Sequence, residues 1–175
     1  MISGRCLPLL VAPLVITGVT VAADNPGSHQ HGHAELQLAI SGQKVDLHFQ
    51  SPAQNLLGFE HRAHTPDQQE TIDSVVEWLS ETPLINTSSI TCILESVAIE
   101  SEFAGNASKP EHGQHADFEI SQLLDCPGLQ SAEALTTPLT ERFPGLEHLD
   151  VAWTGPDGQG AVVLEGDGNR FSLRP

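Results

Sequence analysis

Two neighbouring segments with alternating apolar and polar side chains constrain the fold of this chain most. Residues 34–41 (AELQLAIS) and 44–50 (KVDLHFQ) flank Gly42-Gln43. Alternation with period two is typical of half-buried strands, and a two-residue connection with Gly first predicts a β-hairpin. When Ser41 pairs with Lys44, one face of the hairpin carries only apolar side chains: Leu36, Leu38, Ile40, Val45, Leu47 and Phe49. The rest of the chain therefore has to cover one face of an antiparallel sheet.

The main helix is predicted to begin at Pro66. Thr65 suits the N-cap, Pro66 is favoured at the first helical position, and Gln68 completes a capping box. Pro83 ends the helix. Four apolar residues recur at helical spacing between these limits: Ile72, Val75, Val76 and Leu79. We expect this face of the helix to pack on the sheet.

Two further strands are predicted in residues 90–103 and 115–126, joined by a polar loop. In an oxidising compartment Cys92 and Cys126 are interpreted first as a disulfide, with a zinc-thiolate site as the alternative. Pairing the two cysteines conflicts by one residue with the best match of apolar faces, so a β-bulge is predicted. The apolar match pairs Ile93 with Leu124, Val97 with Ile120 and Ile99 with Phe118.

The last third of the chain predicts a short helix or turn at 136–145 and three strands, at 148–155, 159–165 and 170–173. We expect these strands to form a small antiparallel meander. No strand-helix-strand alternation of the parallel type is visible. The predicted class is therefore α+β, with an antiparallel β-sheet packed with one main α-helix and a small C-terminal β-meander.

Residues 1–23 have the features of a cleavable secretory signal. Arg5 precedes an apolar stretch from Leu7 to Ile16, and the segment ends in Val21-Ala22-Ala23. A membrane anchor is the alternative, but proline and glycine interrupt a stretch that would need about 20 apolar residues. We expect cleavage after Ala23 and a single periplasmic domain over residues 24–175, whose first part, residues 24–33, is a flexible segment that contains histidine.

The charge balance excludes some partners. The chain has 7 Lys and Arg against 23 Asp and Glu, and removing the leader takes away Arg5 but no acid, which leaves 6 against 23 and a net charge of −17. Nucleic acid and anionic lipid would be repelled, so we expect no nucleic-acid binding and no membrane insertion after cleavage. Divalent cations would be attracted, but acidity by itself is more often a means of solubility, so the charge permits cation binding without indicating it.

Clustered histidines are the candidate metal ligands. The chain has nine histidines, and the predicted ligands are His29, His31, His33, His61, His64, His112 and His115. If residues 29–33 extend the first strand, their imidazoles project on one side. Neutral imidazole is a good ligand for Zn²⁺, and Glu35, Glu60 or Glu111 offers a carboxylate. His61 and His64 precede a helix N-terminus, which disfavours a cation, so capping or packing stays open for them. His48 and His148 are interpreted as surface histidines.

No enzyme motif is present in the sequence. It contains no G-x-S-x-G, no H-E-x-x-H, no P-loop and no dinucleotide fingerprint. We therefore predict that the protein is not an enzyme and has no catalytic residues. Two alternatives to a zinc-binding protein stay open: a hydrolase with catalytic zinc, and a disulfide-stapled interaction domain whose histidines are incidental.

Several strings occur together in one order along the chain. They are HGHAELQLAI at 31–40, SPAQNLLGFEH at 51–61, the two cysteines, and ERFPGLEHLDVAWTGPDGQGAVVL at 141–164. This set resembles the ZrgA-type periplasmic zinc-uptake proteins. The resemblance implies a periplasmic protein that binds Zn²⁺ and assists its uptake, passing it to a periplasmic zinc-binding protein or a zinc ABC transporter. His31, His33 and His61 occupy motif positions. Of the long His/Asp/Glu-rich tract common in the family, only EHGQH at 111–115 is present.

Overall fold

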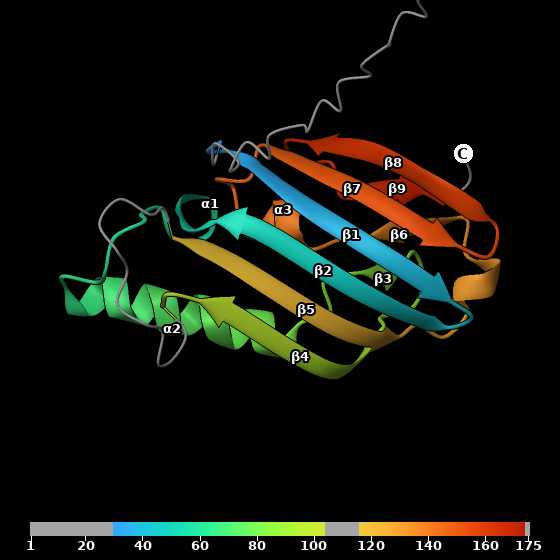
Figure 1. Cartoon of the computed structure of the whole chain (residues 1–175), viewed down its shortest axis with the longest axis horizontal. Coiled ribbons are helices and arrows are strands. Elements are labelled where there is room, and N and C mark those ends of the chain that lie inside the picture. Colours follow the sequence, from blue (N-terminus) through green and yellow to red (C-terminus); the bar gives the residue numbers. More distant parts are fainter. Residues whose placement is uncertain (1–29, 104–115, 174–175) are drawn as a thin grey trace, which may run out of the picture.

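A six-stranded sheet is the centre of the fold. The computed structural model describes residues 30–103 and 116–173. The strands of the sheet lie in the order β4-β5-β2-β1-β7-β8. Their bounds are β1 (His33–Ser41), β2 (Lys44–Pro52), β4 (Ile93–Ser101), β5 (Asp117–Asp125), β7 (His148–Gly155) and β8 (Gly158–Glu165). Neighbouring strands are antiparallel except β1 and β7, which run parallel side by side (Figure 1).

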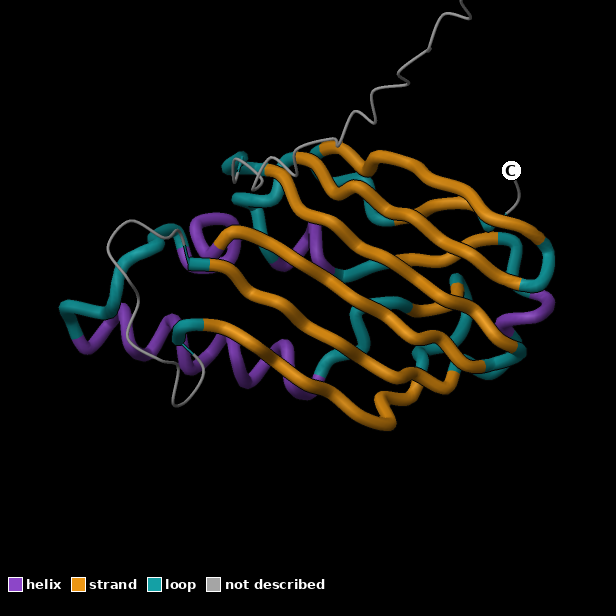
Figure 2. Tube along the Cα trace, viewed as in Figure 1, coloured by secondary structure: helices purple, strands orange, loops and turns teal. Residues whose placement is uncertain are grey.

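A second layer covers one face of this sheet (Figures 1 and 2). It contains α2 (Pro66–Glu81), the short helices α1 (Ala53–Leu57) and α3 (Leu139–Arg142), and the 3-10 turn η1 (Leu129–Ser131). A small sheet, in the order β3-β6-β9, completes it with β3 (Asn86–Thr87), β6 (Ala134–Thr136) and β9 (Arg170–Ser172). The core lies between the two layers, and the other face of the six-stranded sheet is open. The α+β class is thus confirmed.

The hairpin register is confirmed residue by residue. Ser41 is the partner of Lys44, and Leu36, Leu38 and Ile40 pair with Phe49, Leu47 and Val45 respectively. Gly42 takes the left-handed conformation, φ +64°, that the turn requires. Because alternate residues point to opposite faces, Glu35, Gln37, Asp46 and His48 lie on the open face.

The main helix begins and ends as predicted. Thr65 Oγ1 accepts a hydrogen bond from Gln68 N at 3.3 Å, and Gln68 Oε1 accepts one from His64 N at 2.8 Å. The end of the helix is held by Gln122 of β5, a buried polar side chain. Its Nε2 donates to Leu79 O and Thr82 O, and its Oε1 accepts from Leu84 N. The helix is therefore anchored to the sheet by hydrogen bonds as well as by its apolar face.

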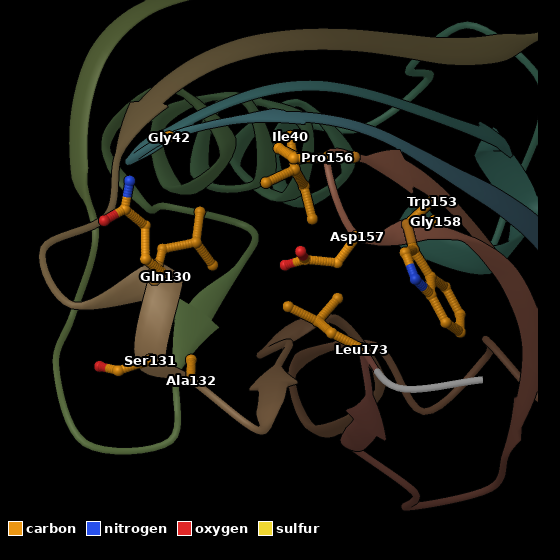
Figure 3. A pocket seen from close by; sticks show the side chains of 12 residues that line it. Ile40, Gly42, Gln130, Ser131, Ala132, Trp153, Pro156, Asp157, Gly158 and Leu173 are labelled. Carbon is orange, nitrogen blue, oxygen red and sulfur yellow. The ribbon is translucent and has the colours of Figure 1, made fainter.

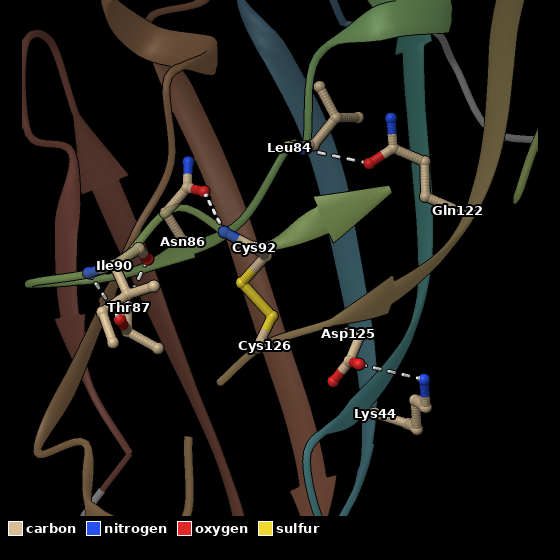
Figure 4. The surroundings of a disulfide bond; sticks show 9 residues. All are labelled: Lys44, Leu84, Asn86, Thr87, Ile90, Cys92, Gln122, Asp125 and Cys126. Atoms are coloured by element: carbon tan, nitrogen blue, oxygen red, sulfur yellow. Dashed lines mark hydrogen bonds and ion pairs between the residues drawn. A yellow bond between two sulfur atoms is a disulfide. The ribbon is translucent and has the colours of Figure 1, made fainter. Parts of the chain in front are cut away.

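Cys92 and Cys126 form the disulfide, so the zinc-thiolate alternative is wrong (Figure 4). The predicted bulge exists, between Leu94 and Ser96, but the apolar pairs expected for β4 and β5 are wrong. Ile99 pairs with Ile120, and Ile93, which pairs with Asp125, is exposed on the open face. The extra residue at the bulge reverses the alternation, because a bulge puts two residues opposite one and so changes which side chains face the core.

The C-terminal strands do not form a meander of their own. β7 and β8 complete the six-stranded sheet, and β9 pairs with β6 in the small sheet. The apolar face of β7, with Leu149, Val151 and Trp153, is buried in the same core as the hairpin. A separate meander would leave this face without a partner layer, whereas parallel pairing with β1 buries it.

Three predicted features fall outside the described residues: the leader at 1–23, His29, and the segment with His112 and His115. Among the described helices none is long and apolar enough to cross a membrane.

The disulfide is predicted to contribute substantially to stability. It closes a loop of 34 residues, and the chain-entropy model gives about 3 to 4 kcal/mol for a loop of that length. Urea denaturation of residues 24–175 should show this loss in free energy of unfolding for C92A/C126A. Reduction of the unsubstituted chain serves as the control and should give a similar loss; a difference below about 1 kcal/mol in both would contradict the prediction.

Candidate metal centre

Four of the predicted ligands lie at one end of the six-stranded sheet. His31 and His33 stand where β1 begins, and His61 and His64 lie in the connection between α1 and α2. β2 ends at the same place, because Glu35 near the start of β1 pairs with Gln50 near the end of β2. Histidines far apart in the sequence are therefore carried to one region by the strand order.

The expected extension of β1 through residues 29–33 is not found in its described part. Residues 31 and 32 form a turn, in which Gly32 has φ +84° and His33 N donates to Gln30 O at 3.0 Å. A side chain at Gly32 would also press against the carboxylate of Glu147, 3.3 Å from an ideal Cβ. His31 and His33 therefore do not share one strand face, and each meets a different partner.

His31 meets a carboxylate. Its Nε2 lies 3.0 Å from Glu60 Oε1, and the side chain of Glu60 is much less exposed than that of His31, at 18% against 57%. A carboxylate oxygen only accepts, so Nε2 carries the hydrogen, and in the neutral ring Nδ1 keeps its lone pair. This carboxylate–histidine contact is the arrangement that commonly orients histidine ligands of metals.

His61 is oriented in a similar way by a backbone carbonyl. Its Nδ1 lies 2.8 Å from Arg62 O, so Nδ1 donates and Nε2 carries the free lone pair of the neutral ring. The ring is stacked between Phe59, at 5.1 Å between centroids, and His64, at 4.9 Å. We call the four residues His31, Glu60, His61 and His64 the loop cluster.

His148, which the sequence indicated only as a surface histidine, lies directly beside His33. It is the Cα partner of His33 in the parallel pair of β1 and β7, and the two rings stack with centroids 4.5 Å apart at an interplanar angle of 29°. We call these two residues the sheet pair. The alternation in residues 148–153 places His148 on the open face, but nothing in the sequence indicates that its strand lies beside β1.

A buried asparagine holds the start of β1 in place. Asn55 of α1 is 4% exposed; its Oδ1 accepts from Gly32 N at 2.7 Å, and its Nδ2 donates to His33 O at 2.8 Å and Ser51 Oγ at 3.1 Å. Gly145 makes room for this helix, because a Cβ there would lie 2.7 Å from Asn55 O. The backbone between His31 and His33 is thus tied to a rigid element.

The potential metal ligands approach one another in twos and do not form a complete coordination site. Within residues 30–103 and 116–173, no three His, Cys, Asp or Glu side chains converge closely enough to hold an ion. Strand pairing and Asn55 hold the backbone that carries His33, and Asn55 holds the turn after His31, whereas His61 and His64 lie in the connection between α1 and α2. Chemically, the region offers imidazole nitrogens and carboxylates, the donor set that suits Zn²⁺ and neighbouring transition-metal ions.

The opposite end of the sheet differs in chemistry. A pocket of about 480 Å³ there is lined mainly by apolar side chains, among them Ile40, Leu129, Trp153 and Leu173. Asp157 is the one carboxylate in the lining, and Figure 3 shows it pointing between Ile40 and Leu173. One carboxylate without imidazole does not make a zinc site.

A lysine side chain also lies at that end of the sheet. Lys44 bonds to Glu95 and lies 3.4 Å from Asp125 (Figure 4). The hydrogen bond that Lys44 donates to Glu95, followed by the one it donates to Asp125, raises the pKa of Lys44. Lys44 and its two carboxylate partners thus lie at the end of the sheet away from the histidines.

Comparison with known proteins finds one family. The family model described as ZrgA family zinc uptake protein matches residues 28–173. No curated protein matches the chain. The match spans the whole described structure, including the loop cluster, the sheet pair and the disulfide.

Asn55 is predicted to position the histidine turn. Asn55→Ala leaves the Gly32 N–H and the His33 carbonyl without their partner, and the expected loss in free energy of unfolding is about 2 to 4 kcal/mol. Chemical denaturation and zinc titration of residues 24–175 measure the two effects, and we expect zinc affinity to fall although no proposed ligand is changed. Gln54→Ala, in the same helix, is the matched control. Unchanged stability and affinity in Asn55→Ala would refute the role.

Proposed function

Because the chain belongs to the ZrgA family of zinc uptake proteins, we propose that it is a periplasmic zinc-binding protein that captures Zn²⁺ through clustered histidines. The capture site is the loop cluster, with His31, His61 and His64 as imidazole ligands. His29, His33, His112 and His115 stay predicted ligands. The captured ion is cargo for zinc acquisition and is not a resident cofactor.

One observation carries the proposal: two imidazoles of the loop cluster already have one nitrogen engaged. His31 donates to Glu60 and His61 donates to Arg62 O, so each neutral ring has its other nitrogen as a lone-pair donor. Fixing the tautomer and the ring orientation in advance lowers the cost of ordering the ligand when the metal arrives. Surface histidines without such partners would lose more side-chain entropy on binding.

Charge and ligand type together select the ion. A net charge of −17 after leader removal raises the local concentration of divalent cations near the protein. Imidazole ligands then favour Zn²⁺ over Ca²⁺ and Mg²⁺, which prefer oxygen. Cu²⁺ and Ni²⁺ bind imidazole at least as tightly by intrinsic affinity, so the preference for zinc rests on which ion is available.

The disulfide supports location outside the reducing cytosol. Cys92 and Cys126 are buried and bonded to each other, and such bonds persist in the periplasm and other oxidising compartments. Residues 1–23 supply the corresponding export signal in the proposal.

Exposure of the loop cluster suits transfer better than catalysis. The side chain of His31 is 57% exposed, so an incoming ligand from another protein can reach an ion held there. We therefore propose that the protein is not an enzyme and that it delivers zinc to a periplasmic zinc-binding protein or a zinc ABC transporter.

Calorimetric titration of residues 24–175, free of tags, tests the capture site. H31A/H61A/H64A removes its three imidazoles, and we expect zinc affinity at this site to fall by a factor of about 100 or more. Glu60→Gln keeps the shape but removes the charged acceptor, and a drop of about 10- to 100-fold is expected. His48→Ala, a histidine on the open face bonded to Ser121, is the control and should titrate normally.

The same titration distinguishes the other functions. Zinc affinity that is unchanged in H31A/H61A/H64A would overturn the capture site. A mature chain that takes up no zinc at micromolar concentration and neutral pH would favour the disulfide-stapled interaction domain. Zinc-dependent hydrolysis of a test ester would favour the hydrolase.

Binding is predicted to be lost on acidification. Protons and Zn²⁺ compete for the same imidazole lone pair. Zinc affinity should therefore be highest at a pH above the range in which imidazole ordinarily titrates, and should fall as the pH drops through about 6. Titrations at several pH values between about 5 and 8 measure this. Affinity independent of pH across that interval would exclude imidazole as the main ligand.

A further inference from the structure

We propose that His33, His148 and Glu165 form a second divalent-cation site, on the open face of the six-stranded sheet. This site uses none of the residues of the loop cluster and does not depend on it. Its ligands come from three adjacent strands: β1 supplies His33, β7 supplies His148 and β8 supplies Glu165. It would take an ion that prefers imidazole, such as Zn²⁺ or Cu²⁺.

Strand register places the three side chains in one row. His33 is the Cα partner of His148, and His148 is the Cα partner of Glu165. Directly opposite residues in an antiparallel pair point to the same face, with Cβ atoms about 4.5 to 5.5 Å apart. The imidazoles are stacked at 4.5 Å between centroids, and Glu165 is exposed. The three donors do not converge as the side chains stand, so forming the proposed site requires the Glu165 carboxylate to rotate toward the two rings.

The backbone under the pair is fixed before any ion binds. Gly32 O accepts from both Glu147 N and His148 N, each at 2.8 Å, and so joins the starts of β1 and β7. On the other strand edge, Gly166 N donates to Glu147 O at 3.0 Å and holds the end of β8 beside them. Ligands on paired strands keep their spacing better than ligands on loops.

The next row of the open face adds negative charge. Glu35 and Asp150 are Cα partners, each two residues along the strand from His33 and His148, and therefore on the same face. Carboxylates directly opposite each other are unfavourable unless a cation offsets them. Their other strand partners are Gln50 for Glu35 and Val163 for Asp150, which bring no positive charge. The row therefore lowers the free energy of a divalent cation held at the sheet pair.

The donor set defines how the site would behave. Two imidazoles and one carboxylate are three protein ligands, which leaves the fourth position of a tetrahedral zinc ion to water or to a ligand from another protein. Such a site exchanges its ion with a partner without first breaking a closed cage. An ion bound there also links β1 to β7 and should raise the melting temperature.

Matched double variants of residues 24–175 test the proposal. H33A/H148A is expected to bind one Zn²⁺ fewer per chain than the unsubstituted protein, to lose part of the zinc-induced rise in melting temperature, and to keep the affinity of the loop cluster within about twofold. H61A/H64A is expected to weaken the loop cluster and to leave the sheet pair intact. His48→Ala, on the same face, is the control. The absorption spectrum of bound Co²⁺ reports the ligand set directly. Glu165→Gln should weaken Co²⁺ binding at this site.

The outcomes separate this site from the capture site. Full zinc stoichiometry and an unchanged Co²⁺ spectrum in H33A/H148A would show that the pair only stacks, and would overturn the proposal. It is equally overturned if both double variants abolish the same single ion. If H31A/H61A/H64A titrates normally while H33A/H148A loses an ion, the capture site fails and the sheet site stands. H33Q/H148Q, which keeps polar side chains on the strands, repeats the test should the alanine variant fold poorly.

Discussion

The parallel pairing of β1 with β7 is the constraint on which the rest of the structure depends. It joins the first described strand to a strand near the C-terminus, over seven residue pairs from His33↔His148 to Ala39↔Thr154. Through it, the apolar faces of the hairpin and of β7 and β8 enter one core. Without it the chain would have two sheets with incomplete cores, because β8 reaches the six-stranded sheet only through β7.

The same pairing helps to hold the backbone at the start of β1. Two buried polar groups hold the start of β1. The Gly32 carbonyl accepts from Glu147 N and His148 N, and the Asn55 amide accepts from Gly32 N and donates to His33 O. Buried polar groups are costly when unpaired, so a full set of partners specifies one arrangement. The backbone between His31 and His33 is held in place in this way.

The two histidine sites proposed for this protein differ in what holds them. The loop cluster depends on second partners of each ring, a carboxylate for His31 and a carbonyl for His61. The sheet pair depends on register, since neighbouring strands set the spacing of His33 and His148. Both lie away from the Lys44 end of the sheet and within an acidic protein, an electrostatic setting that attracts divalent cations.

The sequence by itself determined what is local. Alternation specified the hairpin and its register, Thr65, Pro66 and Gln68 specified the start of the helix, and the two cysteines specified the disulfide, because each signal involves residues close in the chain or a unique pair. The strings at 31–40, 51–61 and 141–164 indicated the zinc-uptake family. Only the tertiary structure decided which strand lies beside β1, where the β4 bulge falls, and that His31 meets Glu60 while His33 meets His148. These depend on non-local packing: several strands have equally suitable apolar faces, and burial of the shared core selects among them.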